Sequence, residues 1–201
     1  SLVLLLGRVV RSAVTLLLVG VMIGYLVSAG VSVMMSFSTP QLIAAYSRWH
    51  FGSYGGVTWG NLVLISLVIG AGLLASLTLA KPLNALLLGE RYAESMGLRL
   101  TMMRTALIAL TSVLAGTVTA FCGPIQFLGI AVPHLARGIF NTSDHRILIP
   151  ATALVGALLA LLADIIAALP GDGVLPLNAI NAAFGAPVVI WILLQRRRLA
   201  L

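Results

Sequence analysis

Long apolar runs separated by short polar segments divide the sequence into six stretches of membrane-spanning character. They cover residues 12–35, 62–80, 105–121, 125–136, 147–169 and 174–194. About 20 apolar residues in a helix cross the hydrocarbon core of a bilayer, so five of the six have a suitable length and 125–136 is short. The pattern predicts an all-α fold, a polytopic transmembrane helical bundle, and one membrane domain over residues 1–201.

The longest polar interruption covers residues 83–104 and carries mixed charge at helical spacing. We interpret it as two short helices, 83–88 and 90–96, separated at Gly89 and ended by Gly97, because glycine favours helix ends. The second helix is expected to place Tyr92, Ala93 and Met96 on one face. Such a segment can lie at a membrane surface and hold a partner.

A second short helix is expected between the first two spans. Ser38 and Thr39 precede Pro40 in the pattern of an N-cap followed by proline at the first helical position, which predicts a surface helix over 41–49. Gly123-Pro124 is expected to close the third span, and Lys81-Pro82 the second.

Composition supports a membrane protein. Hydrophobic residues make up 60% of the chain and charged residues 8%, whereas soluble domains are about 25% charged. The net charge of +7 therefore indicates orientation in the membrane and not nucleic-acid binding. The one cysteine, Cys122, excludes an internal disulfide and a multi-cysteine metal site within this sequence.

The basic residues favour six crossings. If all six stretches cross from a cytoplasmic N-terminus, eleven of the twelve Lys and Arg residues lie inside and only Arg48 lies outside. If 125–136 re-enters instead, six lie on each side. We therefore expect both ends of the sequence to be cytoplasmic.

Few residues offer catalytic chemistry. The sequence has no HExxH, no Gly-x-Ser-x-Gly and no pair of intramembrane carboxylates, and its three histidines fall on different loops, so we expect neither an enzyme nor a metal site. Asp164 is the one acidic residue inside a span. It is expected to reach the outer interface or bond to a neighbouring helix, in preference to a proton or ion relay.

Two further polar features have alternative interpretations. Arg48, beside Tyr46 and Trp49, is either a solvated charge in an aromatic belt or a docking contact for an acidic external partner. Asn178 and Asn181 share one helical face and would be costly against lipid. They are expected to face protein or a water-filled path, and ordinary interhelical hydrogen bonding explains them as well.

Several motifs resemble one family in order and spacing. LGERYAESMGL (88–98), GPIQFLGIAVPHLAR (123–137), DHRILIPATALVGALLALLAD (144–164) and PLNAINAAFGAPVVIWIL (176–193) are similar to the C-terminal half of FecCD-type permeases. These are the membrane subunits of type II ABC importers for ferric siderophores, haem and cobalamin. RWHFGSYGGVTW (48–59) resembles the segment before the family's sixth helix. The resemblance implies that the six spans are helices five to ten and that helices one to four are absent from this sequence.

The resemblance also implies roles for individual residues. The short helices would be coupling helices that contact an ATPase, with contacts at Leu88, Gly89, Glu90, Arg91, Ala93, Glu94 and Gly97. The first and last spans would line a translocation path, where the polar candidates are Ser28, Ser32, Asn178 and Asn181. Arg48 would be the docking contact for the binding protein. The sequence departs from the family pattern at Gln126, Asn178 and Asn181, so the resemblance does not transfer a substrate.

The implied partners are a cytoplasmic ABC ATPase homodimer that holds ATP and Mg, a periplasmic substrate-binding protein, a second copy of the permease and the bilayer of a bacterial inner membrane. No cofactor is expected on this chain. The leading expectation is ATP-driven import of an iron chelate, either a ferric siderophore or haem. The alternatives are a cobalamin permease of the same family and a structural membrane fragment without transport activity.

Overall fold

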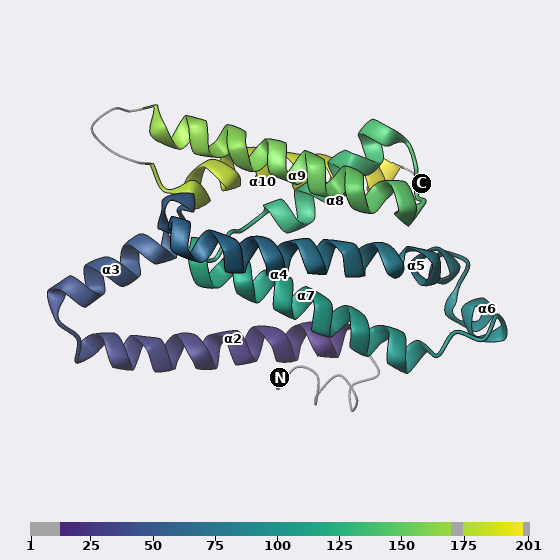
Figure 1. The fold of residues 1–201 in the computed structure, drawn as a ribbon, viewed down its shortest axis with the longest axis horizontal. Helices are drawn as coiled ribbons and strands as arrows, with labels where there is room; N and C mark the ends of the chain where they lie inside the picture. Colours follow the sequence, from purple (N-terminus) through teal and green to yellow (C-terminus); the bar gives the residue numbers. More distant parts are fainter. Residues whose placement is uncertain (1–12, 170–174, 199–201) are drawn as a thin grey trace.

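The computed structural model describes residues 13–169 and 175–198, with the backbone alone described beyond residue 187. Over these residues the chain is helical, without strands (Figure 1). The α-helices are α2 (Ala13–Ser36), α3 (Pro40–His50), α4 (Trp59–Thr78), α5 (Ala80–Leu87), α6 (Glu90–Ser95), α7 (Leu100–Cys122), α8 (Leu128–Phe140), α9 (His145–Ala168) and α10 (Leu177–Arg198). A short 3₁₀ helix, η1, covers Tyr54–Gly56.

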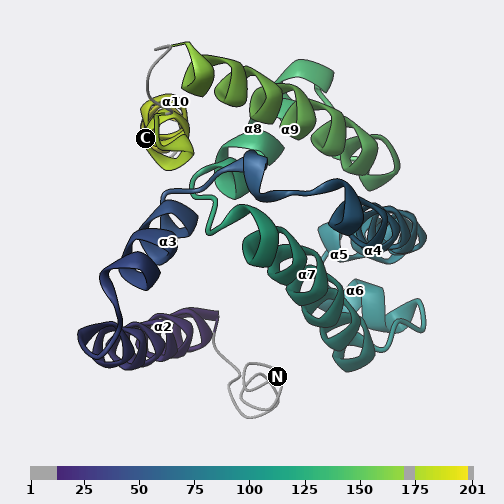
Figure 2. The ribbon, with the colours of Figure 1, turned by 60° about the vertical axis from the view of Figure 1, so that its left-hand side comes forward.

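The helices form two packed groups and one outlying helix. α4 packs against α7, while α8, α9 and α10 pack against one another, and contacts of α9 with α4 and α5 join the groups. α2 lies apart from both groups and reaches them through α3 (Figures 1 and 2). Alanine is the most frequent buried residue in the described part of the chain, and such small side chains let helices approach closely.

The six predicted crossings are not confirmed. Among the described residues, four helices are long and apolar enough to span a membrane: Leu17–Ser36, Trp59–Thr78, Leu100–Cys122 and His145–Ala168. α8 has 13 residues, which at 1.5 Å per residue is about 20 Å and is shorter than the bilayer core. α10 has 22 residues, and most of its second half lies beyond the described side chains.

Most predicted boundaries lie close to the observed ones, but α7 begins at Leu100 where the third span was expected from 105, and α8 covers Leu128–Phe140 where 125–136 was expected. Pro40 is the first residue of α3 and Thr39 its N-cap, although the Thr39 side chain makes no capping hydrogen bond. Gly123, with φ of +80°, ends α7 as expected. Lys81-Pro82, however, does not break the chain, because both residues lie in the first turn of α5, where proline is tolerated. α5 therefore follows α4 after a single residue.

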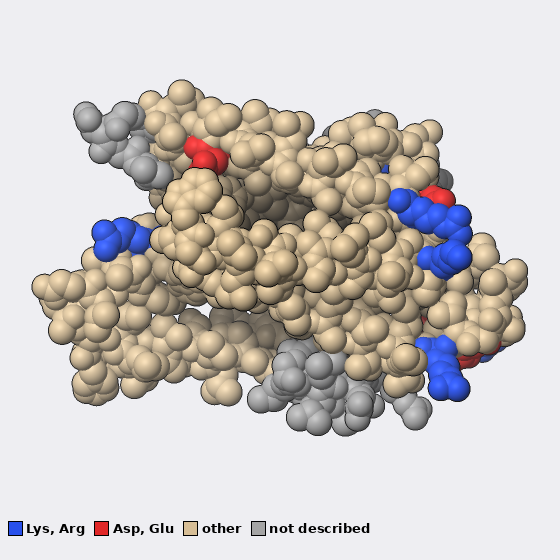
Figure 3. All heavy atoms as spheres, viewed as in Figure 1, with Lys and Arg blue, Asp and Glu red and all other residues tan. Residues whose placement is uncertain are grey.

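Most of the basic side chains gather at one end of the molecule. Figure 3 shows most Lys and Arg atoms of this face at the end where α5 and α6 lie in Figure 1. The opposite end carries Arg48 at the end of α3. The long helices between the two ends expose leucine and valine, which suits a lipid environment.

Candidate functional site

The α5–α6 segment, residues 80–98, projects from the charged end of the molecule. Gly89 connects its two helices with φ of +105°, a backbone conformation that favours glycine. After α6, the Gly97 N–H donates to the Glu94 carbonyl and the Leu98 N–H to the Ala93 carbonyl. This is a Schellman motif with Gly97 at φ of +86°. The predicted pair of short helices is confirmed. Gly89 and Gly97 each have a positive φ, which explains why glycine occupies both positions.

The exposed surface of this segment is apolar. Ala93 is fully buried, whereas Tyr92 is 51% and Met96 62% exposed, so these three residues do not pack inward as one face. A helix of six residues is too short for its sequence period to decide which side packs inward. Leu87 and Leu88 are also more than half exposed. We call Leu87, Leu88, Tyr92 and Met96 the apolar patch.

Charged residues lie between the members of the apolar patch in the sequence. Arg91 and Glu94 are exposed. Glu90 accepts a 2.6 Å hydrogen bond from Arg104 of α7, in an ion pair whose side chains are about 60% exposed. Such an exposed pair contributes about 0–1 kcal/mol. The patch therefore combines apolar area with solvated charge outside the spanning helices, which is the composition of a surface that binds another protein.

Asn178 forms a junction at the opposite end. Its Nδ2 donates to the His50 carbonyl at 3.1 Å and to the Pro124 carbonyl at 2.8 Å. Its Oδ1 accepts from the Gln126 N–H at 3.3 Å, and its own N–H donates to the Phe51 carbonyl. This side chain ties together the end of α3, the loop before α8 and the start of α10. Its amide is occupied by the protein main chain.

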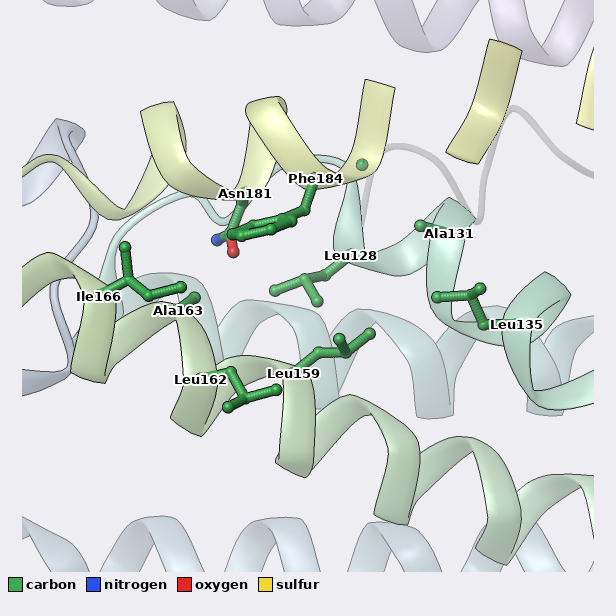
Figure 4. Close-up of a pocket in the computed structure, with 10 residues that line it drawn as sticks. Leu128, Ala131, Leu135, Leu159, Leu162, Ala163, Ile166, Asn181 and Phe184 are labelled. Carbon is green, nitrogen blue, oxygen red and sulfur yellow. The ribbon is translucent and has the colours of Figure 1, made fainter. Parts of the chain in front are cut away.

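Asn181 lies one turn further along α10 beside a cavity of about 220 Å³ between α8, α9 and α10. The other lining residues are apolar, including Leu128, Leu159 and Phe184 (Figure 4). Asn181 is 4% exposed, and its Nδ2 has no hydrogen-bond partner among the described residues. A buried amide donor without a partner costs about 1–3 kcal/mol, so this is an unfavourable place for an asparagine with a purely structural role.

We expect Asn181→Leu to raise stability. Leucine of similar size removes the unpaired donor and adds apolar contacts to the cavity, which should increase the free energy of unfolding by about 1 kcal/mol. Thermal unfolding in detergent measures the shift. A matched Ala182→Leu variant, changed at the neighbouring half-buried position, should show no such gain. A loss of stability in Asn181→Leu would mean that the amide makes a favourable contact in the folded protein.

Ser28 and Ser32 lie on α2, away from both asparagines. Both are exposed, and the Ser32 hydroxyl donates to the Ser28 carbonyl within the helix. The structure therefore brings Asn178 and Asn181 to neighbouring sites on α10 but does not bring the two serines to them. A path role for these four residues stays a prediction.

Arg48 is exposed near the end of α3. The neighbouring Trp49 is more than an aromatic belt residue, because its indole N–H points to the Thr119 and Ala120 carbonyls at 3.2 Å and ties α3 to α7. Asp164 is exposed four residues before the end of α9, and no hydrogen bond to a neighbouring helix is found among the described residues. No cluster of three metal-ligating side chains occurs in the described part of the chain.

Two structural contacts near Asn178 were not predicted from the sequence, the close approach at Gly123 and the conformation of Phe127. Gly123 lies directly against the Trp49 carbonyl, so a Cβ at this position would clash with the main chain. Phe127 has a positive φ of 66° and packs its Cβ against Gly185 of α10. The Gly-Pro pair was a signal for the first, whereas a phenylalanine in a left-handed conformation has no sequence signal.

Comparisons with known proteins agree with this architecture. The chain is 39% identical over 184 residues to the vitamin B12 import system permease protein BtuC of Citrobacter koseri, covering 91% of this chain and 55% of that protein. It is 40% identical to the protein of the same name from Escherichia coli O9:H4, with coverage of 91% and 56%. The chain thus spans about half the length of these relatives.

A solved structure is also similar. It is a metal-chelate type ABC transporter in an inward-facing conformation, with a TM-score of 0.85, 29% sequence identity, and coverage of 94% of this chain and 63% of that chain. Residues 1–195 match the FecCD transport family. The resemblance seen in the sequence motifs is thereby confirmed over almost the whole chain, and the protein belongs to the FecCD transport family.

Proposed function

We propose that the chain is the membrane-spanning part of a permease subunit in an ABC importer that moves a metal chelate across the bacterial inner membrane. The observation that carries the proposal is the apolar patch on the α5–α6 segment, exposed at the charged end outside the four candidate spans. The family membership supplies the class of partner, a cytoplasmic ATPase dimer. The chain itself performs no bond chemistry in this proposal.

In the proposed mechanism, the ATPase dimer grips the two α5–α6 segments of a permease dimer. When ATP binding closes the ATPase, the segments move and the attached helices tilt, which switches a central path between outward and inward openings. A binding protein would deliver the substrate at the other end, where Arg48 is exposed. The free energy that shifts the permease between these two states comes from the different contacts that each state makes with the ATPase.

The substrate proposal rests on the relatives. The proteins that share 39–40% identity are named as vitamin B12 permeases, and the similar structure is named as a metal-chelate transporter. Both names describe a metal ion enclosed in a large organic ligand. We therefore propose a chelated metal as the substrate class. Within this class, cobalamin is the preferred candidate, ahead of the iron chelates expected from the sequence motifs.

Transport assays test this function. The complete permease, reconstituted in proteoliposomes with its ATPase and binding protein, should accumulate labelled cyanocobalamin when ATP is present. A tenfold excess of a ferric siderophore or of haem should leave this uptake unchanged. Uptake of the iron chelate alone would reverse the substrate order, and uptake without ATP would contradict the proposed function.

The apolar patch should be required for ATPase binding. Tyr92→Ala and Leu88→Ala each remove a large exposed apolar side chain, and interface aromatics often contribute more than 2 kcal/mol, so the affinity for the ATPase should fall about 10-fold or more. Co-purification at graded concentrations measures the affinity. Leu154→Ala, on the exposed face of α9, is the matched control and should bind normally. Normal binding by the patch variants would contradict the proposed contact.

Arg48 should contribute to docking of the binding protein. Arg48→Glu reverses an exposed charge and should lower the association rate with an acidic partner several-fold at low salt, with a smaller effect at high salt. Association kinetics at two ionic strengths measure this. If the wild type and Arg48→Glu associate with the binding protein at the same rate at low salt, Arg48 is a solvated charge and not a docking contact.

A further inference from the structure

The α5–α6 segment is tied to α9 by a cluster of three side chains, in which Asn84 meets Asp144 and His145, 60 and 61 residues later in the sequence. Asn84 of α5 donates from Nδ2 to Asp144 Oδ1 at 2.5 Å. Its Oδ1 accepts from the His145 main-chain N–H at 2.8 Å and lies 2.7 Å from His145 Nδ1. Asp144 is the N-cap of α9 and accepts from the Arg146 N–H at 2.9 Å.

The hydrogen-bond directions in this cluster are determined by its chemistry. A main-chain N–H can only donate and an ionised carboxylate can only accept, so the Asn84 amide has one orientation. Its Oδ1 must then accept from His145 Nδ1, which fixes the proton of that imidazole on Nδ1. The pKa of the Asp144 carboxyl lies below its ordinary value because it accepts from the Arg146 N–H and from Asn84. The cluster is therefore a complete network around one carboxylate.

Among the described residues, the cluster is the stronger of two polar ties that hold the segment to other helices. The other is the Glu90–Arg104 ion pair to α7, whose side chains are about 60% exposed, so that water and salt weaken it. The bonds of Asn84 are partly buried, and one of them ends on the Asp144 carboxylate, where a charge-assisted hydrogen bond is stronger than one between neutral groups. α5 also packs directly against α9. A displaced segment would therefore carry α9 with it more readily than it would carry α7 through the ion pair.

We propose that the Asn84–Asp144–His145 cluster is the joint through which movement of the α5–α6 segment is transmitted to α9, and from α9 to the cavity that contains Asn181. α9 packs against α8 and α10 and supplies Leu159, Leu162 and Ala163 to this cavity. This inference rests on the proposed ATPase coupling. It adds the route by which movement of the α5–α6 segment reaches the helices inside the membrane. Asn84, Asp144 and His145 are positioning residues in it.

A carboxylate exchange tests the joint. In the complete transporter in proteoliposomes, Asn84→Asp places two carboxylates in contact, and uptake per ATP hydrolysed should fall at least 10-fold while ATPase binding and hydrolysis stay within about twofold of wild type. The double variant Asn84→Asp/Asp144→Asn restores one amide and one carboxylate, so the pair again has a donor facing an acceptor. It should recover uptake to within about threefold of wild type. Asn61→Asp, the same exchange at an exposed position of α4, is the control and should transport normally.

The outcomes separate this inference from the proposed function. Normal uptake by Asn84→Asp, or a double variant as defective as the single one, would overturn the joint. Loss of ATPase binding in Asn84→Asp would overturn it as well, because the cluster would then shape the docking surface. If Asn84→Asp does not accumulate in the membrane, Asn84→Ala should show the same loss of coupling, and normal uptake by it would overturn the joint. A wild-type transporter without ATP-dependent uptake would instead contradict the proposed function.

Discussion

Gly123→Ala is expected to destabilise the protein by roughly 3 kcal/mol or more. Gly123 has φ of +80° and ψ of 177°, a region of backbone conformation open essentially to glycine alone, and occupying it with another residue costs about 1–3 kcal/mol. An added Cβ would also meet the Trp49 carbonyl and lie 3.3 Å from the Gly52 Cα. Both are main-chain atoms, so the clash can be relieved only by moving α3 away from α7. Thermal unfolding in detergent and yield in the membrane fraction measure the effect.

Gly116→Ala is the matched control for this substitution. Gly116 lies inside α7, and an added Cβ would meet no atom within 4 Å. Alanine in a helix interior is favoured over glycine by about 0.5–1 kcal/mol, so this variant should be slightly more stable than the wild type. If both variants unfold at the wild-type temperature, the close approach of Gly123 to α3 does not occur in the protein.

Asn178→Ala is expected to produce the second large loss, about 2–4 kcal/mol. The substitution leaves the His50 and Pro124 carbonyls and the Gln126 N–H without their side-chain partner. Each lost hydrogen bond contributes about 0.5–1.5 kcal/mol, and more where the partner remains buried. For a chain of this length the melting temperature should fall by about 5–15 °C. Circular dichroism at 222 nm follows the transition.

Two further variants test the direction of these hydrogen bonds. Asn178→Asp keeps the shape but replaces the Nδ2 donor by an oxygen that faces two carbonyl oxygens, so at neutral pH it should be at least as destabilising as Asn178→Ala. Asn61→Ala, at an exposed position on α4, should change stability by less than about 0.5 kcal/mol. Equal stability of Asn178→Asp and the wild type would show that the Asn178 amide does not donate to the two carbonyls.

The positions of the helices could be predicted from the sequence because they depend on local features. A bilayer requires every main-chain polar group to be paired within its own helix, so apolar length alone indicates where a helix lies. Pro40, Gly89 and Gly97 likewise act through the conformation of their own backbone. The number of membrane crossings could not be predicted in the same way, because α8 is too short for its hydropathy to show whether it crosses the bilayer.

The candidate site depended more on tertiary structure. Spacing predicts that Asn178 and Asn181 share a face, but it does not predict their partners. The Asn178 amide bonds to three main-chain groups, whereas the Asn181 Nδ2 has no partner among the described residues and lies at a cavity. Similarly, Tyr92, Ala93 and Met96 were expected on one face, whereas Ala93 is buried and the other two form part of the apolar patch. The direction of a six-residue helix is set by what it packs against.

By itself, the sequence determined a helical membrane protein, the limits of most of its helices, the polar α5–α6 segment and membership of a family. The tertiary structure alone decided which side chains meet. Asn84 reaches Asp144 and His145, and Trp49 reaches the end of α7, across 60 residues or more. The physical reason is range: helix formation and membrane insertion depend on neighbouring residues, whereas a hydrogen bond between distant segments requires the packing of the helices that carry them.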